Sequence, residues 1–439
     1  MTISLGAPTP ASCRAAVGSG RESKNPARAV NSAGSFDPLD ATEMSQALMP
    51  VEGNHSPPVT SSVARRSERF AARQFLWKHS KIERRRRCGR VPTVKNQGAA
   101  LMLSGEGRAS YLGLETCSSV WSCPVCSAQI HASYAGQIAN ALTHHLGNGG
   151  GAAMVTLTMR HKKGDPLSDL WAGLGEAWRA ATRGKEWDKE RAEYGVLGTT
   201  RIVETTFGEN GWHLHVHALI FFSGKPTVAE LELLGKQMFQ RWRTRLTTLG
   251  LRAPLANSGG LDIRPVYSSD ELGAYLNKLS SVDEIAISAA QELSHSDTKT
   301  GRSGGRTPWQ ILGDGMQEKR AAPDMPSASL GIWHEWEDAS RGKRFMVWSR
   351  NTSPEWLAIL DARGEVQTEE QATVDPGPEA QLVGFIPREA WLGLIRHHRP
   401  AIALILNAVE AEGLAGAARC LAHLGLPPPI PPPRSQAAA

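Results

Sequence analysis

The stretch Gly211-Trp-His-Leu-His-Val-His-Ala-Leu-Ile-Phe221 sets three histidines at alternate positions within an apolar run. Side chains of a β-strand point alternately to its two faces, so His213, His215 and His217 share one face. Neighbouring imidazoles on one face can bind a single divalent cation when the rings are neutral. One structural histidine with chance neighbours is a poorer account of three alternating rings. The stretch therefore predicts a metal-binding strand, a feature that several unrelated hydrolase families share.

The segments around this strand predict an antiparallel sheet with helices. Residues 199–207 form a second expected strand, joined to 212–222 by the Gly-Glu-Asn-Gly turn at 208–211. The β-branched run 153–159 predicts a buried strand. Helices are expected at 127–146, 168–183, 228–248 and 388–424, and after a cap at Ser269. This order is typical of an α+β domain built on a central antiparallel sheet.

Glu204 lies on the expected strand across the hairpin from the histidines. A carboxylate at that place would be a third ligand, and it would shift the preference of the site toward Mg²⁺ or Mn²⁺. An ordinary exposed strand glutamate is the equally weighted alternative.

The segment Glu271-Leu-Gly-Ala-Tyr275-Leu-Asn-Lys278 places three chemically active side chains on one face of an expected helix. A tyrosine has an unperturbed pKa of about 10 and needs a nearby cation to act as a nucleophile. Lys278 is placed to lower that pKa or to hold a phosphate, and Glu271 to act as a base. By itself the pattern is more often an ordinary surface set, but a metal-binding strand upstream favours a catalytic role for Tyr275.

A cysteine cluster precedes the histidine strand. Four of the six cysteines fall in one short part of the chain, at Cys88, Cys117, Cys123 and Cys126, with Cys13 and Cys420 as expected bystanders. A Cys-Pro-Val-Cys knuckle with two further cysteines upstream predicts a closed, tetrahedral Zn²⁺ site. Buried free thiols are the alternative. Six cysteines in 439 residues are too few for a disulfide scaffold.

The sequence beside the first of these cysteines is strongly basic, with Arg84, Arg85, Arg86 and Arg87 in succession. Such a run favours contact with nucleic-acid phosphates about as much as it favours a solvated helix face. The whole chain carries a formal charge of +6, which is compatible with a nucleic-acid partner without requiring one.

Composition divides the chain into four predicted segments. Residues 1–63 are expected to be disordered, 64–127 to form a basic zinc module, and 128–350 to form the catalytic domain. Residues 351–439 are expected to hold an acidic linker, a helical segment and a Pro-rich tail that does not pack into a core. The chain shows no apolar leader and no run of about 18 apolar residues, which predicts a cytoplasmic protein without membrane contact.

Taken in order, these motifs resemble those of the rolling-circle plasmid replication initiators (Rep proteins) of the HUH endonuclease superfamily, especially an actinobacterial plasmid branch. The strand 155–159 resembles the first family motif, 211–217 is similar to the histidine–hydrophobe–histidine metal motif, and 274–278 resembles the nucleophile motif. The cysteine segment 116–126 resembles one that precedes the catalytic core in this family. The resemblance covers the chain from about residue 84 to 350.

The resemblance implies an HUH endonuclease fold preceded by a zinc module, and it implies residue roles. His215 and His217 match the metal pair, and His213 matches a further histidine of that motif. Tyr275 matches the catalytic tyrosine and Lys278 the lysine after it, while Glu271 stands where one branch has a glutamate that helps to terminate replication. Two departures are Leu214, where many relatives have proline, and Leu279, where two-tyrosine enzymes have their second tyrosine.

The implied function is binding of a plasmid origin and nicking of one DNA strand, with DNA, a host helicase and a DNA polymerase as partners. A transposase built on the same fold is the alternative within the superfamily. A non-catalytic zinc-dependent DNA-binding regulator and an unrelated metallohydrolase are the alternatives outside it. The sequence leaves the oligomeric state open.

Overall fold

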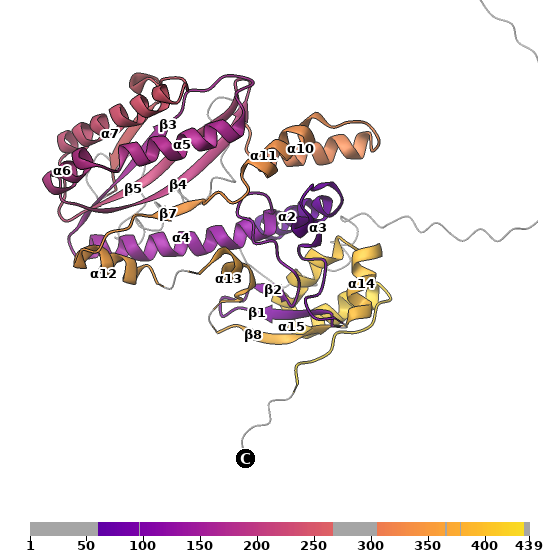
Figure 1. Ribbon diagram of the computed structural model, residues 1–439. Helices are drawn as coiled ribbons and strands as arrows, with labels where there is room; N and C mark the ends of the chain where they lie inside the picture. The colour runs from indigo at the N-terminus through magenta and orange to yellow at the C-terminus, as the bar shows by residue number, and fades with distance from the viewer. Residues whose placement is uncertain (1–59, 96, 267–304, 365–366, 378, 434–439) are drawn as a thin grey trace, which may run out of the picture.

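The computed structural model describes residues 60–95, 97–266, 305–364, 367–377 and 379–433 (Figure 1). Within these ranges the strands form two antiparallel sheets, one with the order β6-β3-β5-β4-β7 and one with the order β2-β1-β8. The two sheets lie in different lobes, and the long helix α4 (Pro124–Gly147) runs between them. The predicted α+β class with an antiparallel sheet is confirmed.

The larger sheet is built around the β4–β5 hairpin, in which the chain reverses between Gly208 and Gly211. Gly211 has a φ of +83°, a conformation that favours glycine, so the turn predicted at 208–211 is confirmed. The strands are β3 (Gly151–Thr158), β4 (Val196–Gly208), β5 (Gly211–Phe222), β6 (Leu261–Pro265) and β7 (Met346–Trp348).

Helices α5 (Leu167–Ala181) and α7 (Val228–Thr248) cover one face of this sheet (Figure 1). A Cβ on Gly235 of α7 would lie 3.1 Å from Cγ2 of Ile263, whose side chain shares a face with those of Val155 and Ala218. That face is opposite the one to which the histidines of β5 point. Helices α5 and α7 therefore do not cover the histidine face.

Among the described residues, helices α4 and α12 (Pro354–Ala362) cover the far end of the histidine face. There the ring of Phe221 contacts His145 of α4 and Trp356 of α12, with ring centroids 5.5 Å apart in both pairs. His215 and His217 lie further along the same face of β5 and keep 14% of their side-chain surface exposed. The imidazoles are thus mostly enclosed but still reach solvent.

The smaller sheet joins segments from both ends of the chain. Strands β1 (Ala99–Leu103) and β2 (Ala109–Leu112) form a hairpin, and β8 (Gln381–Ile386) pairs with β1. Helices α2 (Thr60–His79), α14 (Arg388–His397) and α15 (Ala401–His423) pack around it and bury Leu101, Trp391 and Ile405 completely. The predicted segments 64–127 and 351–439 therefore share one hydrophobic core.

The structure corrects one expectation for the C-terminal region and adds a backbone contact to another. The part expected to be loop-like contains α12 and α13 (Glu369–Val374), each begun by a capping serine or threonine. In the Pro-rich tail, Ile430 and Phe385 exchange two backbone hydrogen bonds of 2.7 Å. The tail therefore pairs along β8, because an isoleucine between prolines keeps the backbone N–H that proline lacks.

Five further described elements lie outside the two sheets and the helices already named. They are α3 (Glu83–Arg87), α6 (Lys185–Glu193), η1 (Ala256–Ser258), α10 (Pro308–Ala321) and α11 (Ala328–Ala339). Glu337 of α11 is fully buried and accepts hydrogen bonds from the Ser80 hydroxyl (2.5 Å) and the Lys81 backbone N–H (3.1 Å). This buried carboxylate fixes α11 against the loop between α2 and α3.

Helix α15 is the one described helix whose length and composition would allow it to cross a membrane, and 50% of its most apolar window is buried inside the protein. Its residues Ile402, Ile405 and Leu406 contribute to the core of the smaller lobe. These contacts account for its apolar composition, so we assign α15 to the core.

Candidate metal centres

The β4–β5 hairpin brings Glu204 to the predicted histidine strand. Glu204 is the Cα partner of His215 in the ladder, so both side chains leave the same face. Oε2 of Glu204 lies 2.9 Å from Nε2 of His217 and 3.2 Å from Nε2 of His215. The prediction that Glu204 lies beside the histidines is confirmed, and its alternative as an exposed strand residue is wrong because only 10% of its side chain is exposed.

These three side chains fit one divalent cation. One ligand atom from each of Glu204, His215 and His217 lies within 4.8 Å of the others. Ligands at about 2.1 Å from a metal and at right angles are about 3 Å apart, close to the spacing between the carboxylate and imidazole atoms. Two imidazoles with one carboxylate suit Mn²⁺, and the carboxylate also accepts Mg²⁺.

Thr156 of β3 holds one of the imidazoles in place. Its Oγ1 lies 2.9 Å from Nδ1 of His217, its Cα partner across the β3–β5 ladder. With a proton on Nδ1, the ring donates to the Thr156 hydroxyl and leaves the Nε2 lone pair for a metal. Nothing local to β3 marks this threonine as functional, because the register between the two strands cannot be read from either strand alone.

The charge state of the site favours a cation. Burial raises the pKa of the Glu204 carboxyl, but hydrogen bonds from His215 and His217 outweigh that effect and hold its pKa well below the ordinary value. The carboxylate is therefore ionised at neutral pH. Glu204 is thus a buried anion beside two imidazoles, a setting that suits a bound positive ion.

His213 lies beside this set and not within it. Its ring centroid is 5.3 Å from that of His215 and 5.0 Å from that of His161, a residue that the sequence analysis passed over. Burial, and then the neighbouring His215 and His161 rings, lower the pKa of His213 to about 4. His213 is thus neutral at physiological pH, and the three-donor set leaves it out.

The predicted nucleophile motif cannot be placed in this geometry. Glu271, Tyr275 and Lys278 lie outside the described residues, as does the helix expected after Ser269. Their roles stay predictions.

The four predicted cysteines meet at the start of α4. Cys88, Cys117, Cys123 and Cys126 are all buried, and their sulfurs lie within 4.8 Å of one another. Pairs involving Cys88 and Cys126 are 3.5–3.8 Å apart. Sulfurs at the corners of a zinc tetrahedron, with Zn–S bonds of about 2.3 Å, are about 3.8 Å apart, so the spacing fits this ion.

The surroundings of the cysteines also fit a bound cation with thiolate ligands. Cys123 is the N-cap of α4 and Cys126 lies in its first turn, where the positive end of the helix favours thiolates. Hydrogen bonds from the three other thiols hold the pKa of Cys88 well below its ordinary value, whereas the pKa values of Cys117 and Cys126 lie above theirs, so negative charge in the metal-free cluster is centred on Cys88. The helix expected from residue 127 begins earlier, at Pro124, because proline suits the first helical position.

Arg73 of α2 is a buried cation beside this cluster. It is 6% exposed, its Nε and one terminal nitrogen have no hydrogen-bond partner among the described residues, and it lowers the pKa of Cys88. A Cβ on Gly89 would lie 2.2 Å from the guanidinium, so glycine at this position lets the arginine approach the backbone next to Cys88. A zinc ion with four thiolates carries a net charge of about −2, which would offset this guanidinium.

The predicted phosphate-binding arginines are paired within the protein. Arg85 is buried, donates to the Ser119 hydroxyl (2.8 Å) and lies 3.7 Å from a Glu337 carboxylate oxygen. The other three have acidic partners as well: Arg84 lies near Glu370, Arg86 pairs with Glu83, and Arg87 pairs with Glu115. Arg85 is therefore structural, and a DNA contact by the other three stays a prediction.

Comparison with known proteins adds two similarities. No family model matches the chain, and no solved structure does. The chain is 30% identical over 305 residues to a protein named Protein rep from Streptomyces lividans, which covers 58% of this chain and 66% of the relative. It is 34% identical over 153 residues to a neomycin resistance protein from Streptomyces cyanogenus, which covers 29% of this chain and 35% of the relative. The chain thus spans less than two thirds of either relative, and the first similarity points to a Rep-like protein.

Proposed function

We propose that this protein is a plasmid replication initiator of the HUH type, which binds a replication origin and nicks one DNA strand. The observation that carries the proposal is the convergence of Glu204, His215 and His217 on one face of an antiparallel sheet. The similarity to Protein rep supports it. Its place of action would be the cytoplasm, where plasmid DNA, a host helicase and a DNA polymerase are available.

The described residues of the histidine site would bind a metal ion and fix its position. A divalent cation held by Glu204, His215 and His217 would supply Lewis acidity at the scissile phosphate. Thr156 would fix the ring of His217, since its hydroxyl lies 2.9 Å from Nδ1. The carboxylate of Glu204 would balance the added charge, and the partly exposed imidazoles would leave the DNA side of the cation open.

The chemical step follows from the resemblance. The phenolate oxygen of Tyr275 attacks the phosphorus in line, the P–O3′ bond breaks, and a 5′-phosphotyrosine forms. The phenolic proton leaves to solvent and the departing 3′ oxygen takes up a proton, which yields the 3′-OH that primes synthesis. Lys278 would stabilise the charge that develops on the phosphate.

Glu271 would close the cycle after one round of synthesis. In this proposal its carboxylate removes a proton from water, the water oxygen attacks the phosphorus at the regenerated origin, and the P–O3′ bond breaks to leave a 5′-phosphate and a 3′-OH. That 3′-OH then attacks the phosphotyrosine, the bond between phosphorus and the Tyr275 oxygen breaks, and the phenolate takes up a proton, so no second covalent bond to protein forms. A single tyrosine in the motif requires such a step, because Leu279 replaces a second nucleophile.

The test is formation of a covalent adduct. Purified protein is incubated with single-stranded oligonucleotides that tile its own replicon, in the presence of Mn²⁺ or Mg²⁺, and then denatured. We expect a denaturant-resistant adduct that requires metal and that Tyr275→Phe abolishes. A metal-loaded protein that binds origin DNA but forms no adduct would rule out the nicking proposal.

The second candidate is a zinc-dependent DNA-binding regulator without catalysis, which the buried cluster of four cysteines favours. A regulator of this kind would bind DNA equally well after Tyr275→Phe, and its DNA binding would require zinc but no Mn²⁺ or Mg²⁺. A transposase on the same fold would form the adduct as well. DNA ends that flank the gene, in place of a nearby origin, would identify that case.

A further inference from the structure

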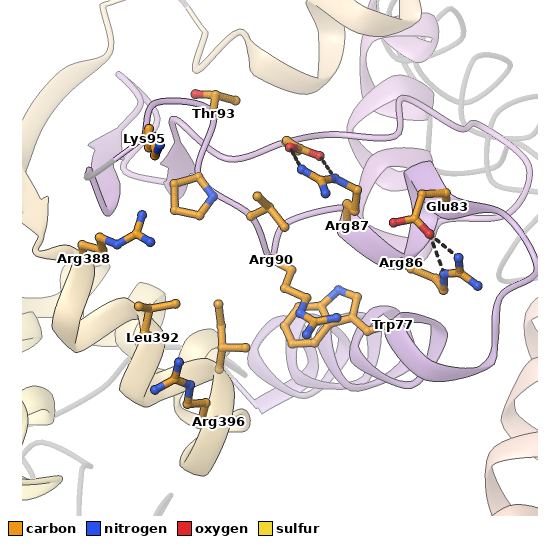
Figure 2. A pocket seen from close by; sticks show the side chains of 14 residues that line it. Trp77, Glu83, Arg86, Arg87, Arg90, Thr93, Lys95, Arg388, Leu392 and Arg396 are labelled. Carbon is orange, nitrogen blue, oxygen red and sulfur yellow. Dashed lines mark hydrogen bonds and ion pairs between the residues drawn. The ribbon is translucent and has the colours of Figure 1, made fainter.

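A pocket of about 670 Å³ lies between α14 and the loop that follows α3 (Figure 2). Its apolar lining includes Trp77, Val91 and Leu392. The cations that line it come from two parts of the chain that are distant in sequence. They are Arg86, Arg87, Arg90 and Lys95 on one side, and Arg388 and Arg396 of α14 on the other.

Most of this positive charge is uncompensated. The pocket has two acidic lining residues, and both are engaged: Glu83 pairs with Arg86, and Glu115 accepts a double hydrogen bond from Arg87. The other four cations, Arg90, Lys95, Arg388 and Arg396, form no ion pair with any residue that the structure describes. An excess of positive charge around one hollow favours an anionic ligand.

The arginines of α14 are held in place by the fold. Arg388, Leu392 and Arg396 are spaced four residues apart and share the face of the helix that lines the pocket. Trp391 and Leu394 anchor the opposite face in the core of the smaller lobe. Across the pocket, the guanidinium of Arg90 lies 5.9 Å from the centroid of the Trp77 ring, which limits its freedom.

We propose that this basic pocket binds the backbone phosphates of duplex DNA, an inference that deepens the proposed function and rests on it. Guanidinium groups bind phosphate in two-pronged fashion, and cations facing each other from two elements suit a strand that passes between them. The Glu204 site belongs to the other sheet, where a single strand would be cleaved. A protein that must find its origin before a strand is exposed needs a separate contact with the duplex.

This assignment shifts the phosphate contacts predicted from the arginine run. Arg85 is buried, and Arg86 and Arg87 enter the pocket with their carboxylate partners attached. The unpaired cations come instead from Arg90, Lys95 and α14, a helix that lies near the other end of the chain.

The test compares Arg388→Gln/Arg396→Gln with the control Arg183→Gln/Arg243→Gln. Both pairs remove two charges from exposed arginines that form no described ion pair, and the control residues lie in the larger lobe. The affinity for an origin duplex is measured between about 50 and 300 mM salt. A single-stranded origin oligonucleotide is used for binding and for adduct formation, and Arg388→Lys/Arg396→Lys tests whether charge alone is required.

We expect the glutamine pair at α14 to weaken duplex binding by on the order of tenfold at low salt, and to reduce the slope of log K against log salt by about 2. The lysine pair should restore most of the slope. The control pair should bind the duplex like the unchanged protein, and the α14 variants should form the single-strand adduct to the same extent as the unchanged protein. Equal duplex affinity and slope in all variants would overturn the proposal. An equal loss of single-strand and duplex binding would overturn its assignment to the duplex.

The outcomes separate this inference from the nicking proposal. If the protein never forms an adduct but the α14 glutamine pair selectively loses duplex affinity, the nicking proposal fails and the phosphate site stands. If the adduct forms normally and duplex binding is unaffected by the substitutions, the nicking proposal stands and the phosphate-site proposal fails.

Discussion

Thr156 and His217 face each other across the β3–β5 ladder, with Oγ1 of the threonine 2.9 Å from Nδ1 of the imidazole. With a proton on Nδ1 the ring donates to this hydroxyl, and the contact then holds the imidazole with Nε2 directed at Glu204. We expect Thr156→Val, which keeps the shape of the side chain, to lower Mn²⁺ affinity by about 10–100-fold. Calorimetric titration of the purified protein with Mn²⁺ measures the effect.

Thr158→Val is the matched control for that change. Thr158 is two residues further along β3, faces His215 in the ladder, and makes no side-chain hydrogen bond with the described residues. Its substitution should leave Mn²⁺ affinity within about twofold of that of the unchanged protein. Equal losses in both variants would mean that the threonines act on the packing of the sheet and not on the orientation of His217.

Glu204 supplies the negative charge of the site. Glu204→Gln keeps the size of the side chain but removes the charge, so we expect Mn²⁺ affinity to fall by more than about 100-fold, beyond the loss at Thr156. Glu209→Gln, at an exposed position of the hairpin turn, controls for the loss of one charge nearby. Unaltered Mn²⁺ binding in Glu204→Gln would exclude the carboxylate as a ligand.

Local sequence was sufficient to predict the hairpin and both clusters of candidate metal ligands. Alternation along 212–222 is a property of one strand, and the Glu-Asn-Gly sequence before it specifies a tight turn. Once the turn is known, the opposition of Glu204 and His215 follows from counting residues outward from it. For the cysteines, the Cys-Pro-Val-Cys spacing carried most of the signal.

Contacts between distant segments could not be predicted in this way. The pairing of β8 with β1 joins residues almost 300 positions apart, and nothing local to Gln381–Ile386 names its partner. The burial of Arg85 depends on Glu337, which lies on another helix, so the arginine run looked uniformly exposed. The role of Thr156 depends on the register of β3 against β5.

Arg73 provides a prediction whose sign depends on zinc. In the zinc-loaded protein its guanidinium offsets the negative thiolate cluster, so Arg73→Met should lower the free energy of unfolding by about 1–3 kcal/mol. Without zinc the same side chain is a buried cation with unpaired nitrogens, and its removal should be neutral or stabilising. Thermal unfolding with and without a strong chelator measures both values.

Arg65→Met is the control for this experiment, because Arg65 is an exposed arginine on the same helix. It should change the unfolding temperature little in either condition. If Arg73→Met destabilises the loaded and the chelated protein equally, the arginine acts through packing on Phe70, whose ring centroid lies 4.4 Å from its guanidinium carbon. The proposed charge balance with the cysteine cluster would then be wrong.

The C-terminal region should be required for folding of the N-terminal zinc module. Truncation after Gly377 removes β8, α14 and α15, and with them the fully buried Trp391, Leu394 and Ile402. Each such side chain contributes about 1.5–3 kcal/mol by burial, so their joint loss exceeds the stability of a typical domain once the rest of α15 is included.

We expect the truncated protein to lose the cooperative unfolding of the smaller lobe and to release zinc to a chelator faster than the full chain does. Truncation after Pro433 removes only residues beyond the described tail and is the matched control. Helix α2 explains why the effect should reach the cysteines: it packs on the C-terminal core through Phe70 and donates from Trp77 Nε1 to the Cys88 carbonyl at 2.9 Å. If the protein truncated after Gly377 retains zinc and melts like the full chain, the two segments fold independently.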